Sequence, residues 1–408
     1  MFQEVFDGPR RLVQHSSAPL APERARYLKH LKDQGYSRLT LASMAADLMR
    51  IVRWLRMDRP VPVTLRQIEA AAVRGGIFID QPGSPRRRFV QLACNWLRFC
   101  NLLVEKPEKP QPFVELIEDF SSWMADARGI SAGTIRRRSR CMGDFFRWRH
   151  PRTGSFREVR ITDIDDYLVY AARRWSRRTM ATQASDLRAF FRYAGSRGWC
   201  SPSIADVIQA PHIYEHELLP STPTWDQVEE LITSIPKRRP IDFRDRATFL
   251  LLAVYGLRAG EAAAIQLADL DWEHDQISIR RPKCRDAKVC PLVPTVGNAI
   301  IEYLKKGRPK SARTDLFLDL VAPYRPMSPG ALGQAFKRRI EKLGLPFARK
   351  GPHSLRHACA THLLGEGFSI KEIGDHLGHL SPKSTQIYAK VDLVGLRAVG
   401  NFDIGGLL

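Results

Sequence analysis

The sequence has no long apolar run. Its longest uninterrupted one, residues 249–257, holds nine residues and already includes a tyrosine and a glycine. A membrane-spanning helix needs about 20 apolar residues. The first residues, MFQEVFDGPRR, have no apolar stretch of the secretory type either. We therefore expect neither a membrane protein nor a secreted one.

Paired cysteines are also missing. The seven cysteines are an odd number, and no two of them form a Cys-x-x-Cys pair. This spacing argues against a disulfide framework and against a zinc ribbon. Reduced thiols are typical of the cytosol, so we expect a cytoplasmic protein.

Acidic residues are few relative to basic ones: 43 Asp plus Glu against 64 Lys plus Arg, a formal net charge of +21. A basic protein with 44% hydrophobic residues should fold and bind a polyanion. The charge recurs within amphipathic segments, which predicts a phosphate-contacting surface. For any single cluster, a solvated helix face is the alternative. The candidate DNA-binding residues are Arg136, Arg137, Arg138, Arg173, Arg174, Arg177 and Arg178.

A chain of 408 residues should hold two to four domains. Two stretches in its first half repeat at a constant shift of 94 residues. Corresponding residues are Gly35, Ser37, Thr40 and Trp54 in the first copy and Gly129, Ser131, Thr134 and Trp148 in the second. Chance similarity of two amphipathic helices is the alternative. We expect two helical modules of one kind, residues 1–107 and 108–204.

Residues 205–222 are proline-rich and aperiodic, and they predict a linker. Beyond them the pattern predicts a mixed, mainly helical domain. Its expected helices are 225–234, 243–255 and 352–366, with caps at Thr224, Ser328, Ser369 and Ser381. Its expected strands are 276–283 and 288–293, joined as a hairpin, and 315–319. The predicted fold class is mainly α with a small antiparallel sheet (α+β).

Residues 352–390 concentrate His, Arg and Tyr. Three interpretations compete for them. His353 and His357 are four residues apart and could bind zinc, but no Glu follows the first His and Arg356 would place a cation beside the metal. Core packing is the better interpretation for His357 and His362 alone. Phosphate chemistry explains more of the residues together.

His353 and Arg356 lie three residues apart, hence on one helix face, and can donate to one oxyanion. A guanidinium reaches two phosphate oxygens at once. Negative charge grows on the non-bridging oxygens when a phosphodiester is attacked, so fixed donors there stabilise the transition state. The reaction then also needs a nucleophile, a leaving-group acid and a second cation.

The order of these groups in residues 223–390 resembles the tyrosine recombinase (phage integrase) family. VYGLRAGEAAAIQL is similar to the family's first-arginine motif, HSLRHACATHLL to its His-x-x-Arg box, and LGHLSPKSTQIYAKV to its closing motif. The resemblance implies six catalytic residues and one supporting carboxylate. They are Arg258, Lys283, His353, Arg356, His379 and Tyr388, with Glu261 in support.

The lysine is the least well marked of these residues. The family sets it on a β-hairpin, eight residues before a Pro-Leu pair, and Pro291-Leu292 thereby indicates Lys283. The glycines that commonly flank it are absent. Lys288 or Arg285 could serve instead, although Lys288 is expected as a solvated charge on the returning strand.

The resemblance also implies a mechanism. Tyr388 would attack a DNA phosphate to form a 3′-phosphotyrosyl link, Lys283 would protonate the leaving 5′ hydroxyl, and no cofactor, metal or ATP would be needed. Residues 108–204 would be the core-binding (SAM-like) domain and 223–390 the catalytic domain. The tail, 391–408, would dock on a neighbouring protomer or pack on its own domain.

The implied partners are double-stranded DNA, three further copies of the chain in a tetramer on paired sites, and accessory recombinases or DNA-bending proteins, all at a bacterial nucleoid. The extra module 1–107 is either an arm-type DNA-binding domain, a second duplex grip or a protein-contact module. Two other functions remain open, a catalytically silent DNA-binding protein and a type IB topoisomerase.

Overall fold

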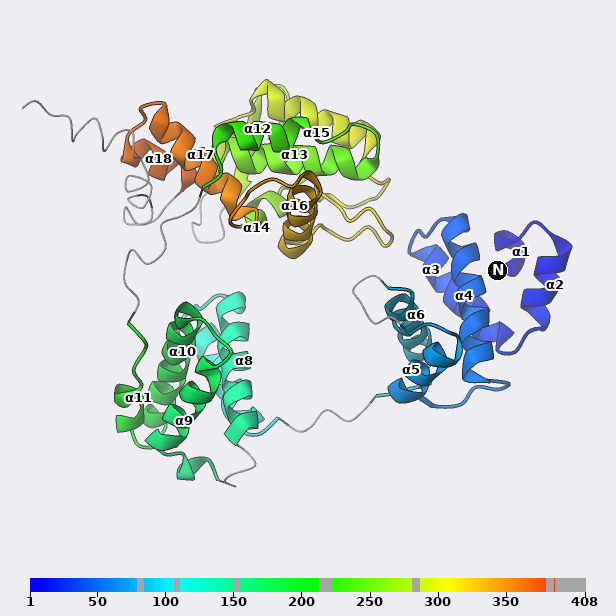
Figure 1. The fold of residues 1–408 in the computed structure, drawn as a ribbon, viewed down its shortest axis with the longest axis horizontal. Coiled ribbons are helices and arrows are strands. Elements are labelled where there is room, and N and C mark those ends of the chain that lie inside the picture. Colours follow the sequence, from blue (N-terminus) through cyan, green and yellow to red (C-terminus); the bar gives the residue numbers. More distant parts are fainter. Residues whose placement is uncertain are drawn as a thin grey trace, which may run out of the picture. The chain divides into compact units, whose positions relative to one another are not determined.

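The structure is a computed structural model (Figure 1). It describes residues 1–78, 84–105, 111–149, 155–212, 222–280, 287–378 and 385. In these ranges no helix combines the length and the apolar character needed to cross a bilayer. The described residues form three separate large hydrophobic cores, each built from one continuous part of the chain.

The first core belongs to residues 1–104 and is helical. Its elements are α1 (Phe2–Val5), α2 (Pro9–Ser17), α3 (Ala21–Asp33), α4 (Arg38–Leu55), β1 (Val63–Thr64), α5 (Leu65–Arg74), α6 (Pro85–Phe99) and β2 (Leu103–Val104). The two short strands pair in parallel. Leu48 and Ile51 of α4 and Trp96 of α6 are fully buried, so α4 and α6 supply the centre of this module.

The second core belongs to residues 111–212. Its elements are α7 (Val114–Asp126), α8 (Ala132–Arg149), the 3-10 turn η1 (Phe156–Glu158), α9 (Ile161–Ala172), α10 (Arg177–Ser196) and α11 (Ser203–Val207). Its centre is aromatic: Phe145 of α8 packs edge-to-face on Phe191 of α10, and Phe146 on Phe190. Aromatic rings of this kind bury large apolar areas in a small domain.

The two modules share one plan. Both ends of α8 lie 94 residues after the corresponding ends of α4. Both helices begin after a serine whose hydroxyl accepts from a threonine amide, Ser37 from Thr40 at 3.3 Å and Ser131 from Thr134 at 3.4 Å. The order of four helices in the first module, α3 to α6, is repeated in α7 to α10. The shift read from the sequence is therefore also the offset between α4 and α8, while the other helix pairs keep the same order.

The third core belongs to residues 222–378. Its helices are α12 (Trp225–Thr233), α13 (Pro240–Val254), α14 (Ala259–Ala263), α15 (Pro294–Lys306), α16 (Pro329–Leu343), α17 (His353–Gly365) and α18 (Ile370–Leu377). A 3-10 turn, η2 (Leu267–Asp269), leads into strands β3 (Leu270–Asp271), β4 (Gln276–Arg280) and β5 (Ala287–Pro291). The strands form an antiparallel sheet in that order.

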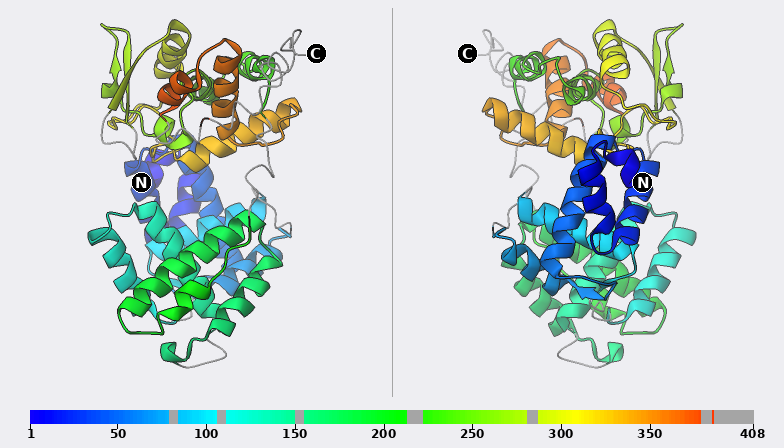
Figure 2. Two further views of the ribbon diagram at one scale, coloured as in Figure 1. Left: turned by 90° about the vertical axis from the view of Figure 1, so that its left-hand side faces the viewer. Right: turned by 90° about the vertical axis from the view of Figure 1, so that its right-hand side faces the viewer.

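Helix α13 is the centre of this third domain. Most of its residues are buried on every side, which is why it reads as an apolar run instead of an amphipathic stripe. Helices α12, α15, α16 and α17 all pack against it or its neighbours (Figure 1). The β4–β5 hairpin stands at the edge of the same domain (Figure 2). Helix α13 ends at Val254, inside the domain, and the motif VYGLR begins at that residue.

The predicted fold class, mainly α with a small antiparallel sheet, is confirmed. The helix caps predicted from the sequence are also confirmed. Thr224 with Gln227 and Ser369 with Glu372 form capping boxes, and Ser328 caps α16. The predicted hairpin is present, and Ile277 lies opposite Cys290. Residues 281–283 of its expected first strand lie outside the described residues. The helix expected to begin at Ser381 lies outside the described residues.

The predicted strand at 315–319 is wrong. Leu316, Phe317 and Leu318 are fully buried. Their backbone groups bond to several different segments: the amide of Leu316 to the Ile265 carbonyl, and the carbonyl of Phe317 to the Met327 amide. This buried segment forms its backbone hydrogen bonds with several separate segments and not with one neighbouring strand. It therefore has only isolated β-bridges.

Candidate functional site

Arg356, on α17, is the central residue of the candidate site. Its side chain is almost wholly buried, at 1% exposure. One guanidinium nitrogen donates to the Gly256 carbonyl at 2.6 Å, and another donates to the Leu377 carbonyl at 2.9 Å. Gly256 belongs to the segment VYGLR, and Leu377, the last residue of α18, is the first residue of the closing motif. One side chain therefore joins all three motif segments.

Gly256 is required by this arrangement. Its backbone has φ of 58°, in the left-handed region that side chains with a Cβ rarely adopt. A Cβ at this position would also overlap the Leu377 side chain and touch the Cys359 sulfur at 3.4 Å. The turn after α13 is thus closely covered by α17 and α18.

We expect Gly256→Ala to destabilise the protein by about 2–3 kcal/mol, from left-handed strain plus overpacking. Urea unfolding monitored by circular dichroism measures this change. Gly344→Ala is the matched control, because its φ is also positive, at 66°, but a Cβ there meets nothing within 4 Å. Equal losses in both variants would mean that the contact with Leu377 contributes nothing.

Arg258 is the second guanidinium of the site. It lies at the start of α14 and pairs with Glu261 one turn later, at 2.7 Å between Nη1 and Oε1. The second carboxylate oxygen, Oε2, accepts from the backbone amide of Arg258 at 2.9 Å. The Glu261 side chain is 2% exposed and the Arg258 side chain is 39% exposed. A buried carboxylate thus orients a half-exposed guanidinium toward the domain surface.

His353 stands at the first position of α17, beside both arginines. Loss of solvent around the ring is the largest cause that lowers its pKa, and the positive charges of Arg356, Arg258 and Arg349 lower it further. The imidazole is therefore neutral at pH 7, with one nitrogen able to donate and the other to accept. Its ring lies edge-to-face on His357 at 4.9 Å.

Lys288, on β5, has a position that the sequence did not reveal. Its ammonium donates to the Asp375 carbonyl at 2.9 Å and to the His376 carbonyl at 3.4 Å, in the last turn of α18. The expectation of a solvated charge is therefore wrong. A cation on these carbonyls satisfies the end of the helix and its dipole, and it fixes the hairpin against α18.

A second tie holds the hairpin from its other side. The Tyr255 hydroxyl donates to the Pro291 carbonyl at 2.7 Å and accepts from the Val293 amide at 3.0 Å. Tyr255 directly precedes Gly256. The same turn therefore positions Arg258, the Gly256 carbonyl that accepts from Arg356, and the base of the hairpin. Burial raises the pKa of this tyrosine.

Three of the sequence-predicted residues, Lys283, His379 and Tyr388, lie outside the described residues, as does Arg285. Their roles stay predictions. The structure brings together Arg258, Glu261, His353 and Arg356. Lys288 was named from the sequence as an alternative acid, but its contacts with α18 were not foreseen, and the structural part of Gly256 was missed. The positive φ of Gly256 could have been suspected from its place just after a helix.

The other histidines of this region have structural contacts. His362 stacks flat on Trp225, with ring centroids 4.0 Å apart and an interplanar angle of 4°. The Nε2 atom of His376 lies 3.1 Å from the Val254 carbonyl. Within the ranges that the structure describes, no three potential ligands gather to hold a metal ion.

The candidate DNA-binding arginines of the second module divide into two groups. Arg137 and Arg138 both contact the buried carboxylate of Asp186, at 2.8 and 3.3 Å. Burial is the largest influence on Asp186 and raises its pKa, and the two arginines oppose it. The other five, Arg136, Arg173, Arg174, Arg177 and Arg178, are exposed. Arg137 remains half-exposed, so α8 presents its charge to solvent.

Residues 223–393 match the phage integrase family, and residues 117–198 match the phage integrase N-terminal SAM-like domain. The putative integrase/recombinase y4rA of Sinorhizobium fredii (strain NBRC 101917 / NGR234) is 32% identical over 381 residues, which cover 91% of this chain and 92% of that protein. The tyrosine recombinase XerD of Listeria monocytogenes (serotype 4b, strain F2365) is 28% identical, over 70% of this chain and 97% of its own.

Solved structures agree in fold. The XerH site-specific recombinase bound to a palindromic difH substrate has a TM-score of 0.56 at 20% identity, covering 75% of this chain and 93% of that one. The Tn1549 transposon integrase with transposon right end DNA has a TM-score of 0.55 at 19% identity, covering 70% and 98%. Because the relative with 32% identity spans 91% of the sequence, this chain belongs to the phage integrase family of tyrosine recombinases.

Proposed function

We propose that this protein is a site-specific DNA recombinase, an integrase or transposase of a mobile element, which cuts and rejoins strands through a 3′-phosphotyrosyl intermediate. One observation carries the proposal: Arg356 is bound to the carbonyls of Gly256 and Leu377. This fixes the segments of Arg258, His353 and the closing motif against one another. Family membership supports the same activity.

The phosphate-binding part of the proposal rests on described residues. Arg258, held by Glu261, and His353 would donate to the non-bridging oxygens of a scissile phosphate, together with Arg356. Charge on these oxygens increases in the transition state, and each preorganised donor there is worth about 2.7–4 kcal/mol. His379, from the closing motif, would add a further donor.

The covalent part of the proposal rests on sequence position. The Tyr388 oxygen attacks phosphorus, the bond to the 5′ oxygen breaks, and Lys283 delivers a proton to that leaving oxygen. The tyrosine proton passes to a base, for which neutral His353 is suited. A 5′ hydroxyl of another strand then attacks the phosphotyrosine and releases Tyr388. The bond energy is retained, so neither ATP nor a metal ion takes part in these steps.

The proposed partners follow from this chemistry. Double-stranded DNA is the substrate, and relatives solved with DNA support it. Exchange of strands between two sites requires paired duplexes, hence a homo-tetramer, with accessory recombinases or DNA-bending proteins as further partners. The 391–408 tail would dock on a neighbouring protomer. The proposed location is the nucleoid in the bacterial cytoplasm.

A nicked suicide substrate tests the proposed function. The protein is incubated with duplex carrying the ends of its own element, nicked so that the short fragment that leaves with a free 5′ hydroxyl diffuses away. A covalent adduct should accumulate on a denaturing gel, equally with and without EDTA. A duplex that is bound without any adduct would indicate a silent DNA-binding protein. Adducts on unrelated duplexes, with relaxation of supercoils, would indicate a topoisomerase.

Lys283 and Lys288 should differ in one decisive respect. Lys283→Ala should slow cleavage by about 10²–10⁴-fold, the usual contribution of a general acid. A 5′-thiolate leaving group, which needs no proton, should restore its rate. Lys288→Ala should slow cleavage equally on both substrates, because it only releases the hairpin from α18. Rescue of Lys288→Ala alone would reverse the two assignments.

A further inference from the structure

The two N-terminal modules differ on one face of their corresponding helices, α8 and α4. On α8 this face carries a row of arginines, here called the basic ridge. Under the shift of 94 residues, Arg136, Arg137, Arg138 and Arg140 of α8 correspond to Ala42, Ser43, Met44 and Ala46 of α4. The buried Asp186 of α10 corresponds to Leu92 of α6. The first module thus lacks both the row of arginines and the carboxylate that holds part of it. Its α4 face is small and apolar where the SAM-like module is cationic.

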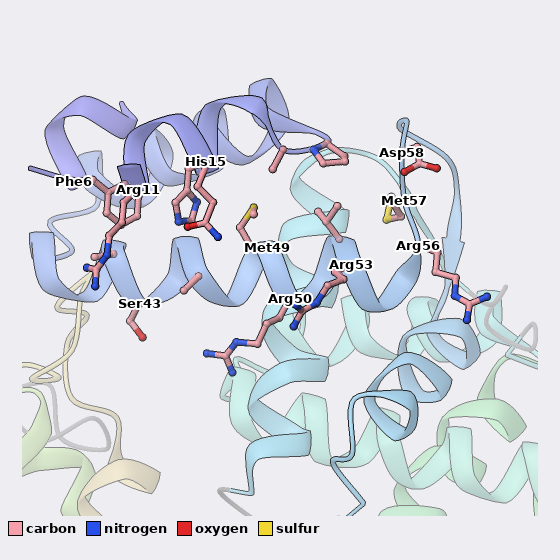
Figure 3. Close-up of a pocket in the computed structure, with 16 residues that line it drawn as sticks. Phe6, Arg11, His15, Ser43, Met49, Arg50, Arg53, Arg56, Met57 and Asp58 are labelled. Atoms are coloured by element: carbon pink, nitrogen blue, oxygen red, sulfur yellow. The ribbon is translucent and has the colours of Figure 1, made fainter. Parts of the chain in front are cut away.

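The altered face of α4 is the floor of a cavity of about 900 Å³. Ala42, Ser43, Ala46 and Met49 line it from α4. Phe6 and His15 line it from the other side, on the segments of α1 and α2, which precede the repeated unit. Figure 3 shows His15 and Met49 facing the same space from opposite sides. The first module has therefore gained a groove where its counterpart has a ridge.

Arg24 fixes the far wall of this groove. Its guanidinium donates to the carbonyls of His15 and Ala18, both at 2.9 Å, and of Pro19 at 3.1 Å. The end of α2 is thereby held above α4. The His15 ring stacks on Phe6 at 4.4 Å and is 94% buried, since only 6% of the residue is exposed. The Nδ1 atom of His15 has no hydrogen-bond partner. A wall this well fixed is preorganised to receive a ligand.

The charged residues of the groove are almost all cationic. Arg11 and Arg56 lie at its two ends in Figure 3, and Arg50 and Arg53 extend from the side of α4 away from His15. Arg50 also pairs with Asp47 at 2.9 Å. Asp58 is the only acidic residue that lines it. From Ala42 to Arg53 the groove follows α4 for about 16 Å, roughly three helical turns. An elongated apolar floor with a cationic rim matches a helical peptide with one apolar and one acidic face.

We propose that this groove docks an acidic amphipathic segment of a partner protein, so that the first module is a protein-contact module and not a second duplex grip. The interaction is independent of the phosphotyrosyl chemistry proposed above. The apolar residues of the segment lie on Ala42, Ala46 and Met49, and its carboxylates face the arginines of the rim.

A model peptide tests the proposal on the full chain. The probe is a fluorescein-labelled 15-residue peptide, with Leu at every third or fourth position and Glu at most others, followed by fluorescence anisotropy. We expect saturable binding that Ala46→Phe weakens at least tenfold by filling the floor. Leu39→Phe, on the same helix but 85% exposed and outside the groove, should leave binding unchanged. Arg50→Gln combined with Arg53→Gln should weaken it and reduce its salt dependence.

Three results would overturn the proposal: equal binding of a scrambled peptide of the same composition, equal binding of a peptide with Lys in place of Glu, or displacement of the probe by a 20-base-pair duplex. The last result would restore the module to DNA binding. Ala46→Phe should also form the covalent adduct on the nicked duplex at the normal rate. A failed adduct assay in the wild type would count against the proposed function and leave the groove unaffected.

Discussion

Tyr388→Phe should abolish the covalent adduct on the nicked substrate while the protein still binds the duplex. Phenylalanine keeps the ring but removes the oxygen that would attack phosphorus, and water cannot replace a positioned nucleophile without changing the product. A denaturing gel measures the adduct, and a mobility-shift assay measures binding. The expected change is complete, because Tyr388 is the nucleophile in the proposed mechanism.

Tyr255→Phe is the control for this change. The Tyr255 hydroxyl is already bonded to Pro291 and Val293, and burial raises the pKa of the phenol, so it is a poor nucleophile. This variant should still form the adduct, although more slowly because the hairpin loses one tie, and it should lose about 1–3 kcal/mol of stability, the cost of leaving buried groups unpaired. An adduct that survives in Tyr388→Phe would assign the nucleophile to another residue.

Arg356→Ala should lower the rate of adduct formation by about 10³-fold and also destabilise the catalytic domain by about 3 kcal/mol. The two effects have separate causes. The rate falls because a phosphate donor is lost. Stability falls because the Gly256 and Leu377 carbonyls lose their buried partner. Single-turnover kinetics and thermal unfolding measure the two effects on the same preparation.

Two further variants separate activity from stability. Arg338→Ala removes an exposed guanidinium from α16 and should change neither quantity. Arg356→Lys keeps one positive charge but cannot donate to two carbonyls in a fixed fork, so both quantities should fall by intermediate amounts. An Arg356→Ala protein that is as stable as the wild type would show that the two carbonyl contacts add nothing to folding.

The parts of the fold that could be predicted are those encoded within a few residues. Capping boxes at Thr224 and Ser369 depend on a side chain and an amide three positions apart, and the sequence displays both. The hairpin register follows from alternation along two adjacent strands. Residues 315–319 were wrongly predicted as a strand. Their three consecutive apolar residues are typical of a buried strand, but they are equally compatible with an irregular segment that crosses the core.

The parts of the site that could not be predicted depend on distant backbone. Motif spacing named Arg356 as a phosphate ligand, but its anchors are carbonyls 100 positions before it and 21 after it. A carbonyl has no signature in the sequence, since every residue carries one. Lys288 was misread for the same reason: its partners are the backbone oxygens of Asp375 and His376, and only the packed fold places them together.

The divergence of the two modules also bears on how one chain folds two similar bundles, one after the other in the sequence, without exchanging their helices. If α8 packed on α6, Arg138 would face Leu92 and lose its carboxylate. If α4 packed on α10, Asp186 would be buried against Met44 with no cation nearby. A buried charge left alone costs several kcal/mol. The Arg138–Asp186 ion pair, which only the second module has, therefore makes an assembly with exchanged helices less stable. Such exchange is the characteristic folding error of duplicated domains.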